Sequence, residues 1–462
     1  MALINHTYTS SDLGYNITSK KTVLWCIVVS MFLTSCKPSL EEPKVSTGIA
    51  DFSRFVVVGD DFTAGFTNGA LTLEGQQNSF PSILASRFTE VGGGAFNQPY
   101  LSVGNGLGFT SLGTLVGQLQ LISVLNCQGK NDFRTKYSVP NPSDLQWLGN
   151  FKKYNNYGIP GAKSFNLESQ TFGKSYPAGN PYYHRFASDT GATSGLTSTV
   201  LGDAFSINPT FFSLWIGIND VLQYAISGGN ENQLPMYEIT ADSTFVLAID
   251  RTINSLTSNG SKGIVLNIPN IENLPFFSTI PYNGLNLTKA EADSLNNTSP
   301  SGVSFHSGAN AFVVNVNGVI RQLSEGELVL LTTSSDSIRC FGLGTPVHPL
   351  SESMILNQQE VSNIHNAIGR FNSKIESATA SANLAFVDVN LLFKSLKSGI
   401  LFNGVDYSTK FISGGAFAID GIHPNAIGYA FIANACLETI NSKYKSTFSN
   451  LDVNQYRGIR FP

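Results

Sequence analysis

The fold of this chain is set by the stretch FVVVGDDFTAG, residues 55–65. Its four leading apolar residues, three of them β-branched, predict a short strand that is buried on both faces. The small residues that follow predict a tight turn and then the start of a helix. A turn from a strand into a helix is a place where an enzyme can present a nucleophile, and Asp61 stands at this position.

The rest of the chain repeats the alternation of strand and helix. Short runs that predict strands lie at 54–59, 154–158, 210–217, 263–268 and 384–388. All but the second are continuous apolar or β-branched runs. Apolar residues at helical spacing predict helices over 244–256 and 358–378. This alternation indicates an α/β protein with a parallel, doubly wound sheet.

Three further motifs lie at the ends of these elements. They are YGIPGA at 157–162, LWIGIND at 214–220 and IDGIHPN at 419–425. Four residues in these motifs could act at a functional site through a side chain or a backbone N–H: Gly161, Asn219, Asp420 and His423. Because ligands bind at the carboxyl ends of the strands in an open parallel sheet, we expect these residues to meet Asp61 at that edge.

The four motifs, in this order, resemble the four blocks of the GDSL, or SGNH, hydrolases. The resemblance covers residues 52–445 and implies a flavodoxin-like, three-layer α/β/α fold that hydrolyses esters. It implies that the Gly161 N–H and the Asn219 side chain bind an oxyanion. It also implies that His423 is the general base and that Asp420 orients it. The family has a serine where this chain has Asp61.

The carboxylate at position 61 changes the chemistry that the resemblance implies. An aspartate is ionised near neutral pH and needs no base, so we expect it to pair with His423 and to raise the pKa of that histidine. Attack of a carboxylate on an ester would produce an anhydride. Ordinary esterase activity of this chain is therefore expected to be impaired.

Three functions remain open at this point. The first is an SGNH-type hydrolase acting on acyl or acetyl esters of lipid or carbohydrate, with Asp61 as a substitution in an otherwise complete site. The second is a non-catalytic lipoprotein that binds such ligands on the same scaffold. The third is a hydrolase in which Asp61 attacks an sp3 carbon as a carboxylate nucleophile. None of the three needs a cofactor.

The N-terminal residues carry a targeting signal. Lys20 and Lys21 precede an apolar run at 22–33, which is too short to span a bilayer and has the length of a signal-peptide core. The run ends in LTSC, which resembles a bacterial lipobox with cleavage before Cys36 and lipid on its sulfur. Residues 37–50 would form a tether. We expect a lipid-anchored protein of the bacterial cell envelope, facing the periplasm or the surface; the alternative is an ordinary signal peptide with an incidental cysteine.

The hydrolase domain is predicted to cover 51–445, followed by an extension at 446–462. Two insertions, at about 91–150 and 280–355, are longer than structureless loops usually are, so we expect them to carry structure and to wall the cleft. Three aromatic residues near the second insertion could line that cleft or form a satellite core, with the core favoured: Phe276, Phe277 and Tyr282.

Composition narrows the class of protein further. The chain has 462 residues, 42% of them hydrophobic, which is enough for a large core. A net charge of -4 provides no basic footprint for nucleic acid. Beyond the lipobox only Cys127, Cys340 and Cys436 remain, an odd and sparse set that predicts no disulfide framework and no metal site. Cys436 lies in a helical apolar pattern and is expected in the core.

Overall fold

A computed structural model describes residues 44–110, 113–149, 153–229 and 235–462. All elements named below belong to one compact unit, Val45–Pro462. The expected signal segment and the lipidated Cys36 lie outside the described residues. Within the described ranges, no helix has the length and apolar character needed to cross a membrane.

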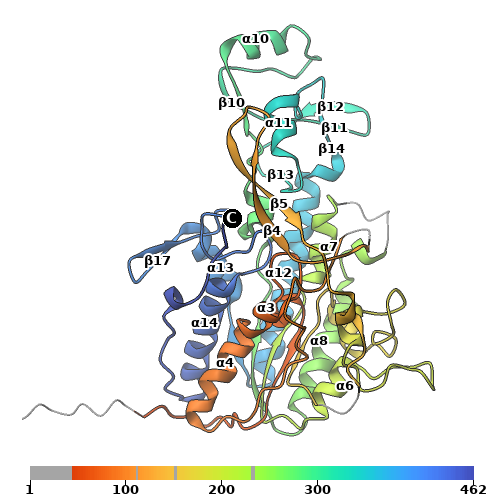
Figure 1. Ribbon diagram of the computed structural model, residues 1–462, viewed down its shortest axis with the longest axis vertical. Helices are drawn as coiled ribbons and strands as arrows, with labels where there is room; N and C mark the ends of the chain where they lie inside the picture. Colours follow the sequence, from red (N-terminus) through yellow and green to blue (C-terminus); the bar gives the residue numbers. More distant parts are fainter. Residues whose placement is uncertain (1–43, 111–112, 150–152, 230–234) are drawn as a thin grey trace, which may run out of the picture. The chain divides into compact units, whose positions relative to one another are not determined.

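Five strands form the central sheet, in the order β16-β8-β7-β1-β6. They are β1 (Phe55–Gly59), β6 (Asn156–Gly158), β7 (Phe211–Trp215), β8 (Lys262–Leu266) and β16 (Ala385–Val387). The sheet lies among the helices in the lower half of Figure 1. Every pair of neighbours in this sheet is parallel. The predicted α/β fold with a doubly wound parallel sheet is confirmed, and each strand falls within its predicted stretch or one residue outside it.

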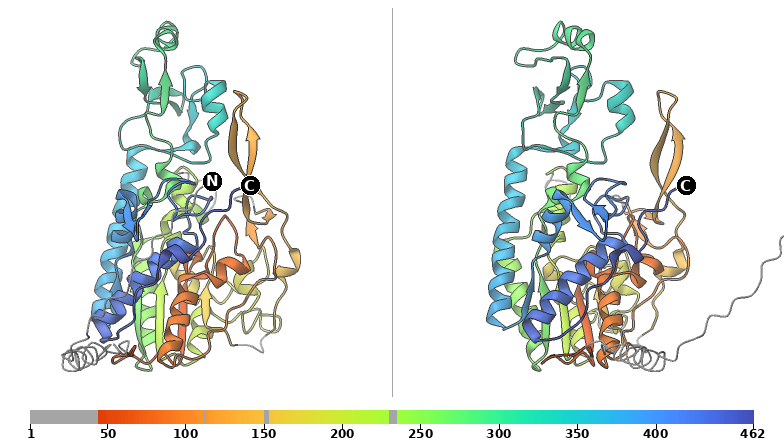
Figure 2. Two further views of the ribbon diagram at one scale, coloured as in Figure 1. Left: turned by 60° about the vertical axis from the view of Figure 1, so that its left-hand side comes forward. Right: turned by 90° about the vertical axis from the view of Figure 1, so that its left-hand side faces the viewer.

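Helices cover both faces of the sheet (Figure 2). The chain moves from β1 outward to β6, then back past β1 to β7 and on to β8 and β16. Right-handed crossovers in opposite directions place their helices on opposite faces. Accordingly α4 (Phe80–Phe88) packs with α14 (Ala426–Tyr444), while α8 (Asp242–Thr257) packs with α6 (Val200–Phe205) and α12 (Gln358–Ser381).

The reversal of direction at β1 creates the place where a ligand can bind. Gly59, the last residue of β1, is in register with Gly158 of β6 on one side and with Trp215 of β7 on the other. The segments that leave these three strands therefore start side by side. A crevice at such a switch point is the usual ligand site of doubly wound sheets.

The helices predicted over 244–256 and 358–378 are confirmed as α8 and α12. The first residue of α12 follows Asn357, whose side chain accepts a hydrogen bond of 3.0 Å from the Glu360 N–H, while the Glu360 carboxylate accepts one of 2.7 Å from the Asn357 N–H. This capping box satisfies two backbone donors at the start of the helix and explains why the helix begins there.

The first insertion is built on a hairpin. Strands β4 (Leu119–Leu125) and β5 (Asn131–Tyr137) pair antiparallel along their whole length, next to the shorter pair β2 (Gly108–Phe109) and β3 (Leu115–Val116). Figure 2 shows the hairpin rising beside the second insertion at the same end of the sheet.

The second insertion has a hydrophobic core of its own. Its strands are β9 (Leu285–Leu287), β10 (Gly308–Asn310), β11 (Val313–Val316), β12 (Val319–Gln322), β13 (Leu328–Val329) and β14 (Leu350–Ser351), with β15 (Ile355–Leu356) at its end. Helices α10 (Lys289–Asn296) and α11 (Ser335–Phe341) complete it. Phe312, Val313 and Val314 lie at the centre of this core, each at most 1% exposed.

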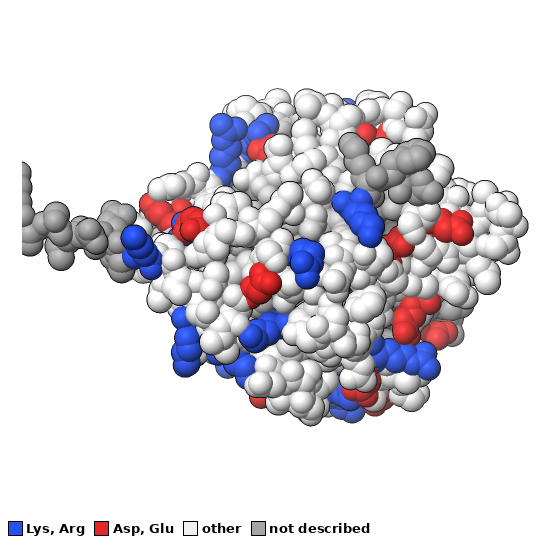
Figure 3. Space-filling model, turned by 90° about the horizontal axis from the view of Figure 1, so that it is seen from below, with Lys and Arg blue, Asp and Glu red and all other residues white. Residues whose placement is uncertain are grey.

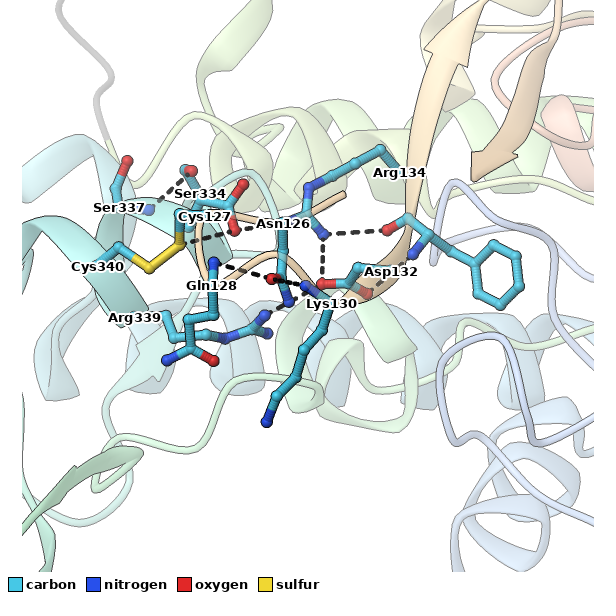
Figure 4. Close-up of polar contacts among 12 residues, drawn as sticks. Asn126, Cys127, Gln128, Lys130, Asp132, Arg134, Ser334, Ser337, Arg339 and Cys340 are labelled. Atoms are coloured by element: carbon cyan, nitrogen blue, oxygen red, sulfur yellow. Dashed lines mark hydrogen bonds and ion pairs between the residues drawn. A yellow bond between two sulfur atoms is a disulfide. The ribbon is translucent and has the colours of Figure 1, made fainter. Parts of the chain in front are cut away.

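A disulfide bond joins the two insertions, although the odd and sparse set of cysteines predicted no disulfide framework. Cys127 in the hairpin turn is bonded to Cys340 in α11, with 6.4 Å between their Cα atoms (Figure 4). The sequence could not reveal this pair because its members are 213 residues apart. Cys436 is a free thiol buried in α14, which confirms its expected place in the core.

Charged side chains are sparse on the face seen from below, where Lys and Arg are mixed with Asp and Glu (Figure 3). No single sign of charge dominates that face, in keeping with the near-balanced composition of 28 basic and 32 acidic residues. A basic surface of the kind that binds nucleic acid is not seen on it.

Candidate functional site

Asp61 is the first residue of the short helix α2 (Asp61–Ala64), directly after β1. The preceding Asp60 caps this helix by accepting a hydrogen bond of 3.2 Å from the Phe62 N–H. A Cβ atom at Gly59 would lie 2.1 Å from the Trp215 carbonyl oxygen, so only glycine allows β1 and β7 to approach this closely before the turn. The turn leaves Asp61 at the edge of the sheet with 8% of its surface exposed.

Segments that follow β6 and β7 bind the Asp61 carboxylate. The Gly161 N–H donates to its Oδ1 over 3.0 Å, and the Asn219 side-chain amide donates to its Oδ2. Gly161 has a φ of +77°, a conformation that favours glycine and turns its N–H toward the carboxylate. Asn219 opens helix α7 (Asn219–Ile226) and is 1% exposed. The structure thus brings Asp61, Gly161 and Asn219 together.

The loop before α14 holds Asp420 and His423 against each other. The His423 Nδ1 lies 3.0 Å from the Asp420 Oδ2, and the Asp420 Oδ1 accepts hydrogen bonds of 2.9 Å from the N–H groups of Ile422 and His423. With Asp420 ionised, Nδ1 carries a proton in this contact and Nε2 is left facing away from Asp420. One short loop therefore sets both the separation and the orientation of the pair.

Two phenylalanine rings place His423 beside Asp61. The imidazole centroid lies 5.1 Å from that of Phe62, the residue after Asp61, and 4.9 Å from that of Phe66. His423 is 6% exposed, and its Nε2 has no hydrogen-bond partner among the described residues. The expected direct pairing of Asp61 with His423 is not formed: the Asp61 oxygens accept hydrogen bonds from Gly161 and Asn219, and the imidazole contacts Asp420.

Electrostatics favour the ionised form of both partners. Burial lowers the pKa of His423, but the Asp420 carboxylate, its hydrogen bond and the Asp61 carboxylate outweigh burial and raise the pKa above the ordinary 6.5. Burial raises the pKa of Asp420, yet His423 and two backbone N–H groups bring it below the ordinary 3.8. The pair therefore contributes its full stabilisation of the fold between pH 3.8 and pH 6.5, the ordinary pKa values of the two groups. Its contribution is lost as pH rises through the raised pKa of His423, or falls through the lowered pKa of Asp420.

Removing the Asp61 charge should therefore lower the pKa of His423. We expect Asp61→Ala to show this downward shift in an NMR titration of the imidazole, because one of the two carboxylates that favour the charged ring is gone. Asp293→Ala, which removes an exposed carboxylate from α10, is the matched control and should leave the titration unchanged. An unchanged pKa in Asp61→Ala would contradict the placement of Asp61 beside His423.

Sequence reasoning missed a buried polar group behind Asn219. The carboxylate of the adjacent Asp220 accepts hydrogen bonds of 2.8 Å from the N–H and from the hydroxyl of Ser164. Burial raises the pKa of Asp220, and burial also lowers the pKa of Lys163, whose ammonium donates to the Glu238 carbonyl over 2.7 Å. These bonds tie the segment after Gly161 to α7. The aspartate of the IND motif, directly after Asn219, was the available signal.

The aromatic residues considered for the cleft pack into cores instead. Phe276 and Phe277 are 8% and 1% exposed in the main core, and Tyr282 packs against the core of the second insertion. Within the described ranges, no group of three or more His, Cys, Asp or Glu side chains is placed to hold a metal ion.

The assembled site has the parts needed for acyl transfer except a hydroxyl nucleophile. Two N–H donors converge on one carboxylate, and a histidine with a fixed tautomer stands next to it. The donors bind the carboxylate that stands in the nucleophile's place. Such a site can stabilise negative charge at that point and can accept or donate a proton at Nε2 of His423.

Comparison with known proteins gives distant structural matches only. No protein-family model matches the chain, and no curated protein matches it. A variant of Axe2, an acetylxylan esterase from Geobacillus stearothermophilus, is 11% identical over 86% of this chain and 98% of its own, with a TM-score of 0.36. LAE5, an alpha/beta hydrolase from the metagenome of Lake Arreo, Spain, is 12% identical over 85% of this chain and 96% of its own, with a TM-score of 0.33. Similarity at this level does not distinguish one activity from another.

Proposed function

We propose that this chain is an SGNH-type scaffold for hydrolysis of acyl or acetyl esters of lipid or carbohydrate, with its nucleophile position occupied by Asp61. One observation carries the proposal: the Gly161 N–H and the Asn219 amide converge on the side chain of residue 61, beside the buried Asp420–His423 pair. In a serine-type mechanism these groups would be the oxyanion donors, the orienting carboxylate and the general base.

The contacts of Asp61 also explain why ordinary ester turnover should be impaired. A carboxylate extends one atom further than a serine hydroxyl, and both of its oxygens accept hydrogen bonds from the donors that an oxyanion would need. A substrate carbonyl would have to displace this charge-assisted pair of bonds. For the same reason the two donors are poorly placed to bind an ester without cleavage, which counts against a ligand-binding role through them.

The alternative of Asp61 as a nucleophile is supported less well. A carboxylate that attacks carbon needs a free oxygen lone pair aimed at the substrate. Each oxygen here accepts one hydrogen bond and keeps a second lone pair, but hydrogen bonding to an anion lowers its nucleophilicity. Hydrolysis of p-nitrophenyl acetate and of longer acyl esters by Asp61→Ser is the test that separates the readings. A folded variant without His423-dependent turnover would contradict the proposed function.

We also propose that the protein is exported and lipid-anchored through Cys36 in the bacterial cell envelope. The targeting motif motivates this proposal, and the Cys127–Cys340 disulfide supports export because such bonds persist in oxidising compartments outside the cytoplasm.

Cys36→Ala should therefore release the protein from the membrane fraction into the soluble periplasmic or extracellular fraction, because the lipid-bearing sulfur is lost. Cell fractionation followed by immunoblotting measures the result, and the disulfide should still form in the released protein. Retention in the membrane fraction would contradict the anchor, and recovery in the cytoplasm would contradict export.

A further inference from the structure

A tight turn lies against the loop that holds Asp420 and His423, which is called the catalytic loop below. Asn68 and Gly69 are its two central residues, with φ of 53° and 71°. Thr67 and Ala70 close it through two reciprocal backbone hydrogen bonds of 3.1 Å. Asn-Gly is the pair that best tolerates two left-handed residues in succession, so the sequence specifies this turn locally.

The turn contacts the catalytic loop at two successive residues. The Asn68 side-chain oxygen accepts a hydrogen bond of 3.1 Å from the Ile419 N–H, and the Gly69 N–H donates to the Asp420 Oδ2 over 2.8 Å. This Oδ2 is the oxygen that also contacts Nδ1 of His423. One carboxylate oxygen is therefore shared between the turn and the imidazole.

The first insertion holds the turn in place from its other side. The Leu119 N–H, at the start of β4, donates to the Asn68 carbonyl over 2.7 Å. A Cβ atom at Gly69 would lie 3.4 Å from the Leu119 side chain and 3.5 Å from the ring of Tyr137 on β5. The base of the hairpin thus packs against the turn, and the turn packs against Asp420.

We propose that Asn68 is a positioning residue for the Asp420–His423 pair. Its amide fixes the backbone at Ile419, and its left-handed conformation aims the next N–H at the Asp420 carboxylate. Asp420 is thereby kept in the rotamer that contacts Nδ1 of His423. The catalytic part of this role rests on the function proposed above, whereas the effect on the histidine does not.

The test uses Asn68→Gly, which keeps the left-handed conformation and removes the amide. In an Asp61→Ser background we expect kcat for p-nitrophenyl acetate to fall by about five- to tenfold with KM unchanged, the effect of losing one hydrogen bond that positions the base. Asn68→Asp keeps an acceptor for the Ile419 N–H. At the pH where kcat has levelled off, this variant should therefore keep most of the kcat of the Asp61→Ser parent.

Asn317→Gly is the matched control. Asn317 and Gly318 form a turn with φ of 51° and 85° in the β11–β12 hairpin, and Asn317 is exposed. The control should leave kcat unchanged. An equal loss in both variants, or no loss in Asn68→Gly, would overturn the proposal.

A second measurement separates this proposal from the proposed function. In the chain with Asp61 retained, NMR titration of His423 should show a lower pKa in Asn68→Gly than in the unaltered protein and no shift in Asn317→Gly, because a displaced Asp420 supports the imidazolium less. This result is expected even if Asp61→Ser proves inactive. An unchanged His423 titration in Asn68→Gly would overturn the positioning role whatever the outcome of the ester assays.

Discussion

Asp61→Ser is expected to hydrolyse p-nitrophenyl acetate at least about 100-fold faster than the unaltered chain, since one member of a catalytic triad usually accounts for that much or more. The change shortens the side chain and removes its charge. It also frees the Gly161 N–H and the Asn219 amide, which now bind the carboxylate. These donors could then bind the oxyanion that develops on the substrate.

The gain should depend on His423. The Nε2 atom of this residue is buried and has no partner among the described residues, so it is free to accept a proton from a nearby hydroxyl. His423→Ala in the Asp61→Ser background should abolish the gain, because the serine then lacks a base. Asp61→Ala is the matched control, since it frees the donors without supplying a nucleophile and should remain inactive.

The ester hydrolysis rate of Asp61→Ser should increase with pH. A base must be neutral to accept a proton, so kcat/KM of Asp61→Ser should rise with pH as His423 loses its proton and then level off. Brisk ester hydrolysis by the unaltered chain, independent of His423, would show that another nucleophile acts and that the site is assigned wrongly.

Loss of the Cys127–Cys340 disulfide should destabilise the protein by about 5 kcal/mol, the chain-entropy figure for a closed loop of 213 residues. The bond restricts the unfolded chain between the two insertions, and a loop of this length has much freedom to lose. We expect the double variant Cys127→Ser, Cys340→Ser to unfold at a lower denaturant concentration than the parent.

Ion pairs near the bridge cannot replace it. Arg134 binds Asp132 and Asp336 over 3.0 and 2.6 Å, and Arg339 binds Asp132 over 3.2 Å (Figure 4). These side chains are 27% to 38% exposed, and partly exposed pairs contribute up to about 1 kcal/mol each.

Reductant provides the control for the disulfide prediction. A thiol reductant should lower the stability of the parent protein and leave the double variant unchanged. Equal stability of the parent and the double variant in the absence of reductant would contradict a stabilising role for the bridge.

Local sequence was sufficient for the sheet and for the membership of the site. A run such as residues 55–58 has one favourable fate, a strand buried on both faces, and it falls in β1 as predicted. The four-motif resemblance named Asp61, Gly161 and Asn219, and the observed order of the strands that they follow brings them to one edge. The three-residue spacing of Asp420 and His423 likewise determines their contact within a single loop.

Contacts between distant segments were not accessible to that reasoning. The strands of the insertions are mostly short, so apolar runs in the sequence do not identify them. The Cys127–Cys340 pair depends on how both insertions fold. The turn at Asn68 could be recognised from Asn-Gly, but its bond to a loop 351 residues away could not.

The sequence alone thus specified the strands and their parallel arrangement, because these follow from short-range patterns of burial and turn formation, and its motif resemblance indicated which residues would meet at the carboxyl edge. Only the tertiary structure showed which groups bind the Asp61 carboxylate. Charge alone predicted His423 as its partner. In the folded chain two N–H donors from the segments that follow β6 and β7 bind it instead, and the imidazole is held toward Asp420.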